Sequence, residues 1–180
     1  MIKKTTAIIL AAMVITLSGC NNAQPAATTT TNTVQVTGAD ASEDLYFYTE
    51  DIKYYLPTLI DAHFALCDVI FEDNASTLRN SSEKCREITE KFLALDCPCE
   101  SMSEVHNTMI ADGEKYLGFL DKIDRYAYYI DEAQTRTDFT DEEMIEMQEL
   151  IEFKADPYKD YTAFENSIYA ALDAAQLNLQ

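Results

Sequence analysis

Apolar residues recur every three or four positions along the chain from residue 45 onward, a spacing typical of amphipathic α-helices. Successive segments of this kind cover 45–69, 78–95, 102–130 and 144–179. In the first segment the apolar positions are Leu45, Tyr48, Ile52, Tyr55, Leu59, Ala62, Leu66 and Val69. No segment alternates with period two, so no strand is predicted. Four helical segments joined by short turns predict an all-α fold, an elongated antiparallel up-down four-helix bundle.

Helix boundaries carry recognisable signals. Asp73 and Asn74 bound the start of the second segment. Pro57 predicts a kink or a short break near Leu56, and Pro157 interrupts the fourth segment. The predicted starts of the other three segments are a Ser42 N-cap, a Ser101–Glu104 capping box and a Thr140–Glu143 capping box.

The first twenty residues differ from the rest of the chain. Lys3 and Lys4 precede an apolar stretch over 7–17, which is too short to span a bilayer and is typical of a signal peptide. The stretch ends in Leu17-Ser18-Gly19-Cys20, which resembles the lipobox of bacterial lipoproteins. This resemblance implies that the chain is cleaved before Cys20 and that the Cys20 thiol carries a diacylglycerol. Two or more acyl chains anchor a protein stably to a membrane.

The predicted organisation has three parts: a lipoprotein signal peptide over 1–19, a lipidated Cys20 with a flexible Thr/Ala-rich tether over 20–42, and an acidic helical-bundle domain over 43–180. A tether of this length spans on average about 25 Å. The lipobox resemblance implies a lipid-anchored protein on the outward face of the cell membrane. The residue after the lipidated cysteine is Asn21 rather than aspartate. In a cell with two membranes, this resembles the sorting pattern of lipoproteins that are delivered to the outer membrane.

Charge narrows the classes of partner. The net charge of the chain is −19, and the only charged residues before residue 43 are Lys3, Lys4 and Asp40, so the domain over 43–180 has 11 basic and 31 acidic residues and a net charge of −20. Such a domain repels phosphate backbones, which argues against nucleic-acid binding. Four glycines and four prolines are too few for an all-β fold with its frequent turns. The 47% content of hydrophobic residues is enough for a buried core.

Four cysteines fall within the domain, and outside the cytoplasm they predict disulfides. Of the three possible pairings we favour Cys67–Cys85. If the first turn centres near Asn74, these residues are offset by about 4.5 Å along the helices, whereas Cys97 lies about 18 Å beyond Cys85. Cys97-Pro98-Cys99 is then left as a redox-active pair, a pair of free thiols or a crosslink to a partner, or as two thiols without a role.

Metal binding is a sharper alternative for the same residues. His63 and Cys67 are four residues apart, on one helix face, and Cys85 faces them in the predicted hairpin. An N,S,S trio suits zinc or copper, but a closed zinc site needs a fourth ligand. His106 is predicted about 10 Å away, too far to supply it. We therefore expect a packed or surface histidine, with no metal and no cofactor.

Residues 95–106 run Leu-Asp-Cys-Pro-Cys-Glu-Ser-Met-Ser-Glu-Val-His. A Pro-Xaa-Glu turn followed by a histidine early in a helix is similar to a pattern in small helical-bundle lipoproteins of Gram-positive bacteria. This resemblance implies location and fold only, since those families mostly lack assigned activities. On this basis His106 is expected to cap or pin the turn rather than to catalyse.

No hydrolase elbow, phosphate-binding loop, dinucleotide fingerprint or zinc-protease motif occurs, so no catalytic residue is predicted. We expect a non-catalytic module that binds a partner protein or a cationic ligand through its acidic, tyrosine-bearing surface. The tyrosines expected there are Tyr46, Tyr54, Tyr128, Tyr129, Tyr158 and Tyr169. The alternatives are a thiol or metal protein that uses His63, Cys67 and Cys85 or the Cys97/Cys99 pair, and an assembly or inhibitor subunit.

Overall fold

The computed structural model describes residues 38–180, with side chains from residue 42 onward. The prediction of an all-α fold is confirmed, since these residues form five α-helices, one short 3-10 helix and no strand. In chain order they are α1 (Gly38–Val69), α2 (Ala75–Leu93), η1 (Glu100–Met102), α3 (Ser103–Thr135), α4 (Asp141–Phe153) and α5 (Lys159–Asn178). Within this part of the chain no helix combines the length and the apolar composition that crossing a membrane requires.

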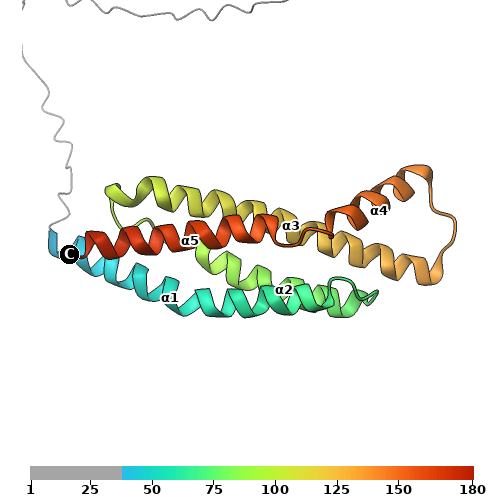
Figure 1. Ribbon diagram of the computed structural model, residues 1–180, viewed down its shortest axis with the longest axis horizontal. Helices are drawn as coiled ribbons and strands as arrows, with labels where there is room; N and C mark the ends of the chain where they lie inside the picture. The colour runs from blue at the N-terminus through green and yellow to red at the C-terminus, as the bar shows by residue number, and fades with distance from the viewer. Residues whose placement is uncertain (1–37) are drawn as a thin grey trace, which may run out of the picture. The chain divides into compact units, whose positions relative to one another are not determined.

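Four of the helices pack against one another around a shared core. α1 and α2 form a hairpin, α3 returns along α2, and α5 lies against both α1 and α3 (Figure 1). α4 packs on α3 alone among the helices. The end of α5 lies beside η1, where the Ser101 hydroxyl donates to Asn178 Oδ1 at 3.0 Å. The predicted core stripes are thus buried between helices that are distant in sequence.

α1 is longer than the sequence indicates. Ser42 lies inside the helix rather than at its N-cap, and the helix continues through Pro57, so the predicted break does not occur. The proline removes one backbone donor, but packing of the surrounding turns on the core holds the helix together. The buried side of α1 carries His63, which is fully buried, whereas the predicted core residue Ala62 is only half-buried.

The boundaries of α2 and α3 show one correct and one wrong prediction. The Asn74 side chain accepts a hydrogen bond from the Thr77 amide at 3.1 Å, so Asn74 caps α2. The predicted Ser101–Glu104 capping box does not form, because Ser101 lies within η1 and α3 begins at Ser103. The Ser101 hydroxyl bonds Asn178 instead, which ties this junction to α5.

The predicted fourth segment is two helices. α4 begins at the Thr140–Glu143 capping box, as predicted, and ends at Phe153. The chain then turns over 154–158, around Pro157, and begins α5. The proline ring would clash with the carbonyl four residues earlier in a continuous helix. This turn separates α4, which among the described helices packs on α3 alone, from α5, which completes the core.

Candidate functional site

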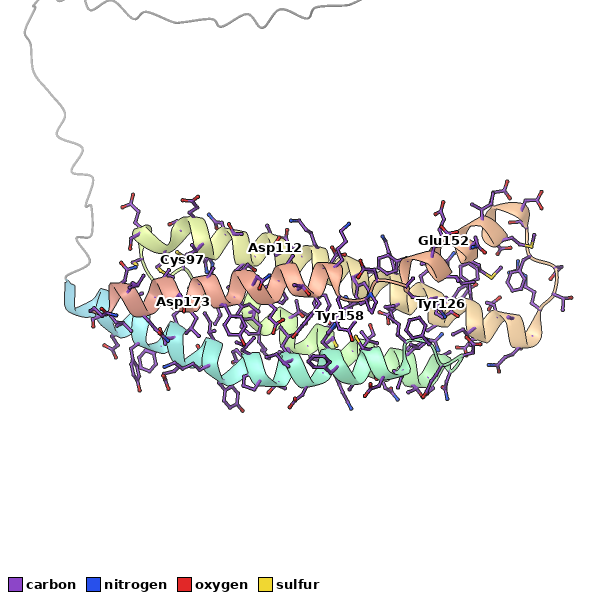
Figure 2. All side chains as sticks on the ribbon, viewed as in Figure 1. Cys97, Asp112, Tyr126, Glu152, Tyr158 and Asp173 are labelled. Atoms are coloured by element: carbon purple, nitrogen blue, oxygen red, sulfur yellow. The ribbon has the colours of Figure 1, made fainter. Side chains whose placement is uncertain are left out.

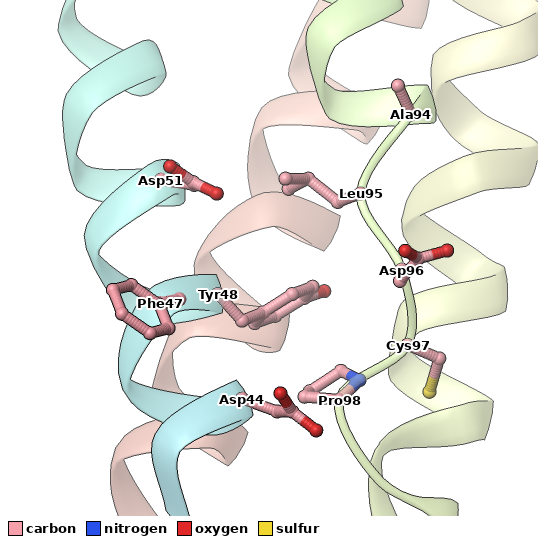
Figure 3. A pocket seen from close by; sticks show the side chains of 9 residues that line it. All are labelled: Asp44, Phe47, Tyr48, Asp51, Ala94, Leu95, Asp96, Cys97 and Pro98. Atoms are coloured by element: carbon pink, nitrogen blue, oxygen red, sulfur yellow. The ribbon is translucent and has the colours of Figure 1, made fainter.

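An open pocket lies between α1 and the linker of residues 94–99 that joins α2 to η1. Asp44, Phe47, Tyr48 and Asp51 line it from α1, and residues 94–98 line it from the linker (Figure 3). Its volume is about 360 Å³, at the small end of the range of ligand sites. We call this site the acidic pocket. Its α1 residues share one face because their spacings of three and four match the helical turn.

The acidic pocket concentrates negative charge that no basic side chain of the described residues neutralises. Asp44, Asp51 and Asp96 contribute three carboxylates, and in the part of the chain that the structure describes none of them forms an ion pair. The Phe47 ring beside them is 55% exposed. An aromatic face attracts cations, as carboxylates do. Charge and aromatic surface therefore favour a ligand that is both cationic and partly apolar.

The inner wall of the acidic pocket is fixed by a hydrogen bond between two helices. Tyr48 on α1 is buried, and its hydroxyl lies 3.1 Å from Nδ1 of His106 on α3. Burial lowers the pKa of His106, while the negative charge of Asp96 opposes this effect. The imidazole is therefore neutral at pH 7 and does not offset the carboxylates. The resemblance led us to expect that His106 would cap or pin the turn; the hydrogen bond that its side chain forms joins α3 to Tyr48 of α1.

The two linker cysteines are free thiols. Cys97 lines the acidic pocket, but its sulfur lies 3.2 Å from the Cys99 carbonyl oxygen and 3.8 Å from the Ser103 hydroxyl on α3. Cys99 Sγ lies 3.2 Å from the Ser101 hydroxyl. Each sulfur has its own polar neighbour, so the structure holds the pair as two separate thiols.

His63 is the centre of a second polar cluster, inside the core. Its Nδ1 lies 2.9 Å from the Tyr116 hydroxyl on α3, and its Nε2 lies 3.3 Å from Cys67 Sγ one turn further along α1. The ring stacks on Tyr161 of α5, with centroids 3.6 Å apart. Tyr158, just before α5, lies edge-on to the same ring and is shown between α5 and α1 in Figure 2. Three helices therefore hold the imidazole in one orientation.

This cluster is uncharged at neutral pH. Burial lowers the pKa of His63 to about 4 and raises the pKa of the Cys85 thiol to about 11, although a hydrogen bond with Tyr116 opposes the second effect. Burial also raises the pKa of the Cys67 thiol, and a hydrogen bond with Tyr158 lowers it by a smaller amount. A reactive cysteine needs a lowered pKa, because the thiolate is the nucleophile. The arrangement stabilises the core and does not activate either thiol.

The favoured Cys67–Cys85 disulfide is absent from the structure, in which both residues are free. The two sulfurs have different neighbours: Cys67 Sγ lies 3.3 Å from Nε2 of His63, whereas the fully buried Cys85 lies beside Tyr116 of α3. His63, Cys67 and Cys85 do approach one another, but no group of three or more His, Cys, Asp or Glu side chains that could hold a metal occurs in the described residues. The lipobox cysteine, Cys20, lies outside the described residues.

Sequence reasoning missed the residues that form the acidic pocket. Asp44, Phe47 and Asp51 have helical spacing, which is a signal in the sequence, but nothing there shows that Asp96 lies opposite them. The tyrosine surface is confirmed for five of its six members, which are 38–75% exposed. Tyr129 is the exception: it is 2% exposed, and its hydroxyl bonds Glu146 of α4. The exposed tyrosines are spread over several helices.

Comparisons of the chain with protein-family models, with curated proteins and with solved structures find no match. The geometry of the acidic pocket and the chemistry of its residues therefore carry the functional argument.

Proposed function

We propose that this chain is a lipid-anchored, non-catalytic binding protein that captures organic cations in the acidic pocket. The observation that carries this proposal is the convergence, on one pocket, of an exposed phenylalanine ring and three carboxylates that form no ion pair with a described residue. α1, α2, α3 and α5 are inferred to form an antiparallel up-down bundle that supports it. Bound through Cys20, the domain is expected on the outward face of the membrane.

The ligand class follows from the lining. A primary or quaternary ammonium group is stabilised by carboxylates and by an aromatic face, and the apolar side chains of Leu95 and Pro98 contact its carbon atoms. An anion is repelled by Asp44, Asp51 and Asp96. A neutral sugar gains little binding energy, because the pocket offers it one exposed aromatic ring, that of Phe47, to stack on. Binding weakens as salt rises, since the carboxylates are open to solvent.

Isothermal titration calorimetry tests this function with 1,4-diaminobutane and tetramethylammonium as probes and acetate as the anion control. The purified chain is expected to bind the two cations and not acetate. Asp51→Asn and Phe47→Ala should each weaken binding by roughly 5- to 30-fold, the effect of about 1–2 kcal/mol. Glu142 is an exposed acid on α4 and does not line the acidic pocket. Glu142→Gln therefore removes one negative charge, as Asp51→Asn does, but should leave the affinity unchanged. Equal losses for Asp51→Asn and Glu142→Gln would show only general electrostatic attraction.

The anchor is tested separately. Membranes from cells that express the full chain should contain the protein, and Cys20→Ser should release it to the soluble fraction or leave the precursor uncleaved. Mass spectrometry of the wild-type N-terminal peptide should show an acylated Cys20. An unmodified Cys20 in a mature, membrane-free protein would refute the anchor and leave the pocket proposal intact.

The thiol and metal alternative has weaker support. Cys67 and Cys85 are protonated and hydrogen-bonded in a neutral cluster, and the described residues contain no metal-holding group. Cys97 and Cys99 face separate partners. These features favour a structural role for the inner pair.

A further inference from the structure

α4 presents apolar side chains on two opposite faces. Leu150 is buried against α3, and the Phe153 ring lies 5.1 Å from the Phe119 ring of α3. On the other side Met144, Ile145 and Ile151 are exposed by 55%, 60% and 46%. A surface helix is ordinarily polar on the side that faces water. The second apolar face of α4 is therefore not needed for the fold.

This second face forms a continuous surface. Asp141, Met144, Ile145 and Gln148 line an open groove of about 460 Å³, and Ile151 extends it by one helical turn. We call Met144, Ile145, Gln148 and Ile151 the α4 outer face. None of the other described helices packs on it, because α4 contacts α3 alone among them (Figure 1).

Strong polar contacts fix the orientation of α4. Arg125 of α3 donates from Nε and from a terminal nitrogen to the two carboxylate oxygens of Glu146, both at 2.9 Å, and Tyr129 bonds the same carboxylate. Arg136 bonds Glu143 near the start of the helix. After its end, Lys154 Nζ donates to the Tyr126 hydroxyl at 2.6 Å. The outer face is thus a preorganised platform, which lowers the entropic cost of binding.

The charge around the outer face selects the partner. Glu143 and Glu146 are paired with arginines, but the carboxylates of Asp141, Glu142, Glu149 and Glu152 form no ion pair with a described residue. Glu152 is labelled on α4 in Figure 2. If a second copy of this chain bound here through its own α4, its four carboxylates would lie against these four, and like charges repel. A partner with basic residues around an apolar stripe complements both features.

We propose that the α4 outer face binds a basic amphipathic helix of a partner protein. The apolar side of that helix covers Met144, Ile145 and Ile151, and its lysines or arginines meet the surrounding carboxylates. This surface is on a different helix from the acidic pocket, so the inference does not depend on the proposed function. Burying the three apolar side chains supplies affinity, and the charges supply orientation and specificity.

Fluorescence anisotropy tests the proposal with a dye-labelled 18-residue peptide of leucine and lysine. Leucine occupies one face with helical spacing, and a scrambled peptide of the same composition is the peptide control. The purified chain is expected to bind the amphipathic peptide at least roughly tenfold more tightly than the scrambled one. The Ile145→Gln/Ile151→Gln variant should lose this preference. The matched control is Phe64→Gln, which replaces an equally exposed apolar residue of α1 and should keep it.

Circular dichroism melts establish that all variants are folded, as expected for surface substitutions. Three results would overturn the proposal: no binding of the amphipathic peptide, equal affinity for the two peptides, or the same loss in the Phe64→Gln variant. A concentration-dependent dimer of the wild-type chain that Ile145→Gln/Ile151→Gln abolishes would assign the face to a second copy instead, which also overturns it.

Discussion

Acidification should destabilise the fold through His63. The imidazole is fully buried, bonds Tyr116 and Cys67, and stacks on Tyr161, and burial lowers its pKa from 6.5 to about 4. The side chains that contact the ring are the Cys67 thiol and the phenols of Tyr116, Tyr158 and Tyr161, and among the described residues burial is the effect that moves its pKa. A histidine whose pKa is lowered by folding stabilises the protein above pH 6.5, and this stability is lost as the pH falls towards 4.

The magnitude follows from the two pKa values. At pH 5 the unfolded chain binds a proton at His63 while the folded chain does not, which lowers the free energy of unfolding by about 2 kcal/mol relative to pH 7. The loss approaches about 3 kcal/mol at pH 4, where the folded protein begins to bind the proton. His106 contributes in the same direction, since burial lowers its pKa too. Such a loss is a sizeable part of the stability of a typical domain.

Urea unfolding followed by circular dichroism at pH 7, 6 and 5 measures this effect. His63→Asn is the matched variant, because its amide can still bond Tyr116 but does not titrate. The variant is expected to be less stable at pH 7, since it loses the stacking on Tyr161, but to lose about 2 kcal/mol less than the wild type between pH 7 and 5. The reasoning is refuted if both proteins show the same pH dependence, or if the His63 resonances titrate near pH 6.5 in the folded protein.

Two further predictions follow from the packing. Gly118→Ala should raise the free energy of unfolding by about 0.5–1 kcal/mol, because alanine favours the helix and nothing lies within 4 Å of the added Cβ. Gly113→Ala should instead lower the free energy of unfolding by about 1–3 kcal/mol, because the added Cβ would lie 2.8 Å from Leu93 Cδ2 and 2.9 Å from Phe164 Cε2. Urea unfolding measures the stability of both variants. A change of the same sign in the two variants would contradict the packing argument. When the native protein is labelled with Ellman's reagent, the exposed thiol of Cys97 should react first, and the buried thiol of Cys85 should react only when the protein unfolds. Rapid reaction of Cys85 in the native protein would contradict this prediction and show that the core opens around this residue.

The helical character of the chain and most of its core followed from the sequence because helical periodicity is a local property. Apolar residues three and four positions apart predicted the buried side of α3, which carries Met109, Tyr116 and Ile123. Capping signals are equally local: the Thr140 capping box begins α4 as predicted, and α2 begins directly after the predicted boundary at Asp73 and Asn74. Where such predictions failed, a tertiary contact replaced the local one: Ser101 bonds α5 instead of capping α3.

Only the tertiary structure decided how helix faces meet. The sequence placed His63 and Cys67 on one side of a helix, but their chemistry changed when Tyr116 and Tyr161 enclosed the imidazole and kept it neutral. The division of the last segment at Pro157 likewise left α4 with a free apolar face that its pattern alone does not distinguish from a core stripe.

The acidic pocket shows this limit most clearly. Asp44 and Asp51 are neighbours on α1 by spacing alone, whereas Asp96 joins them from a linker 45 residues further along the chain. Their meeting depends on the rotation and the lengthwise offset of α1 relative to α2, which many side chains across the core set together. A periodic sequence determines which face of each helix turns inward, but the packing of all faces determines which polar residues then share a pocket.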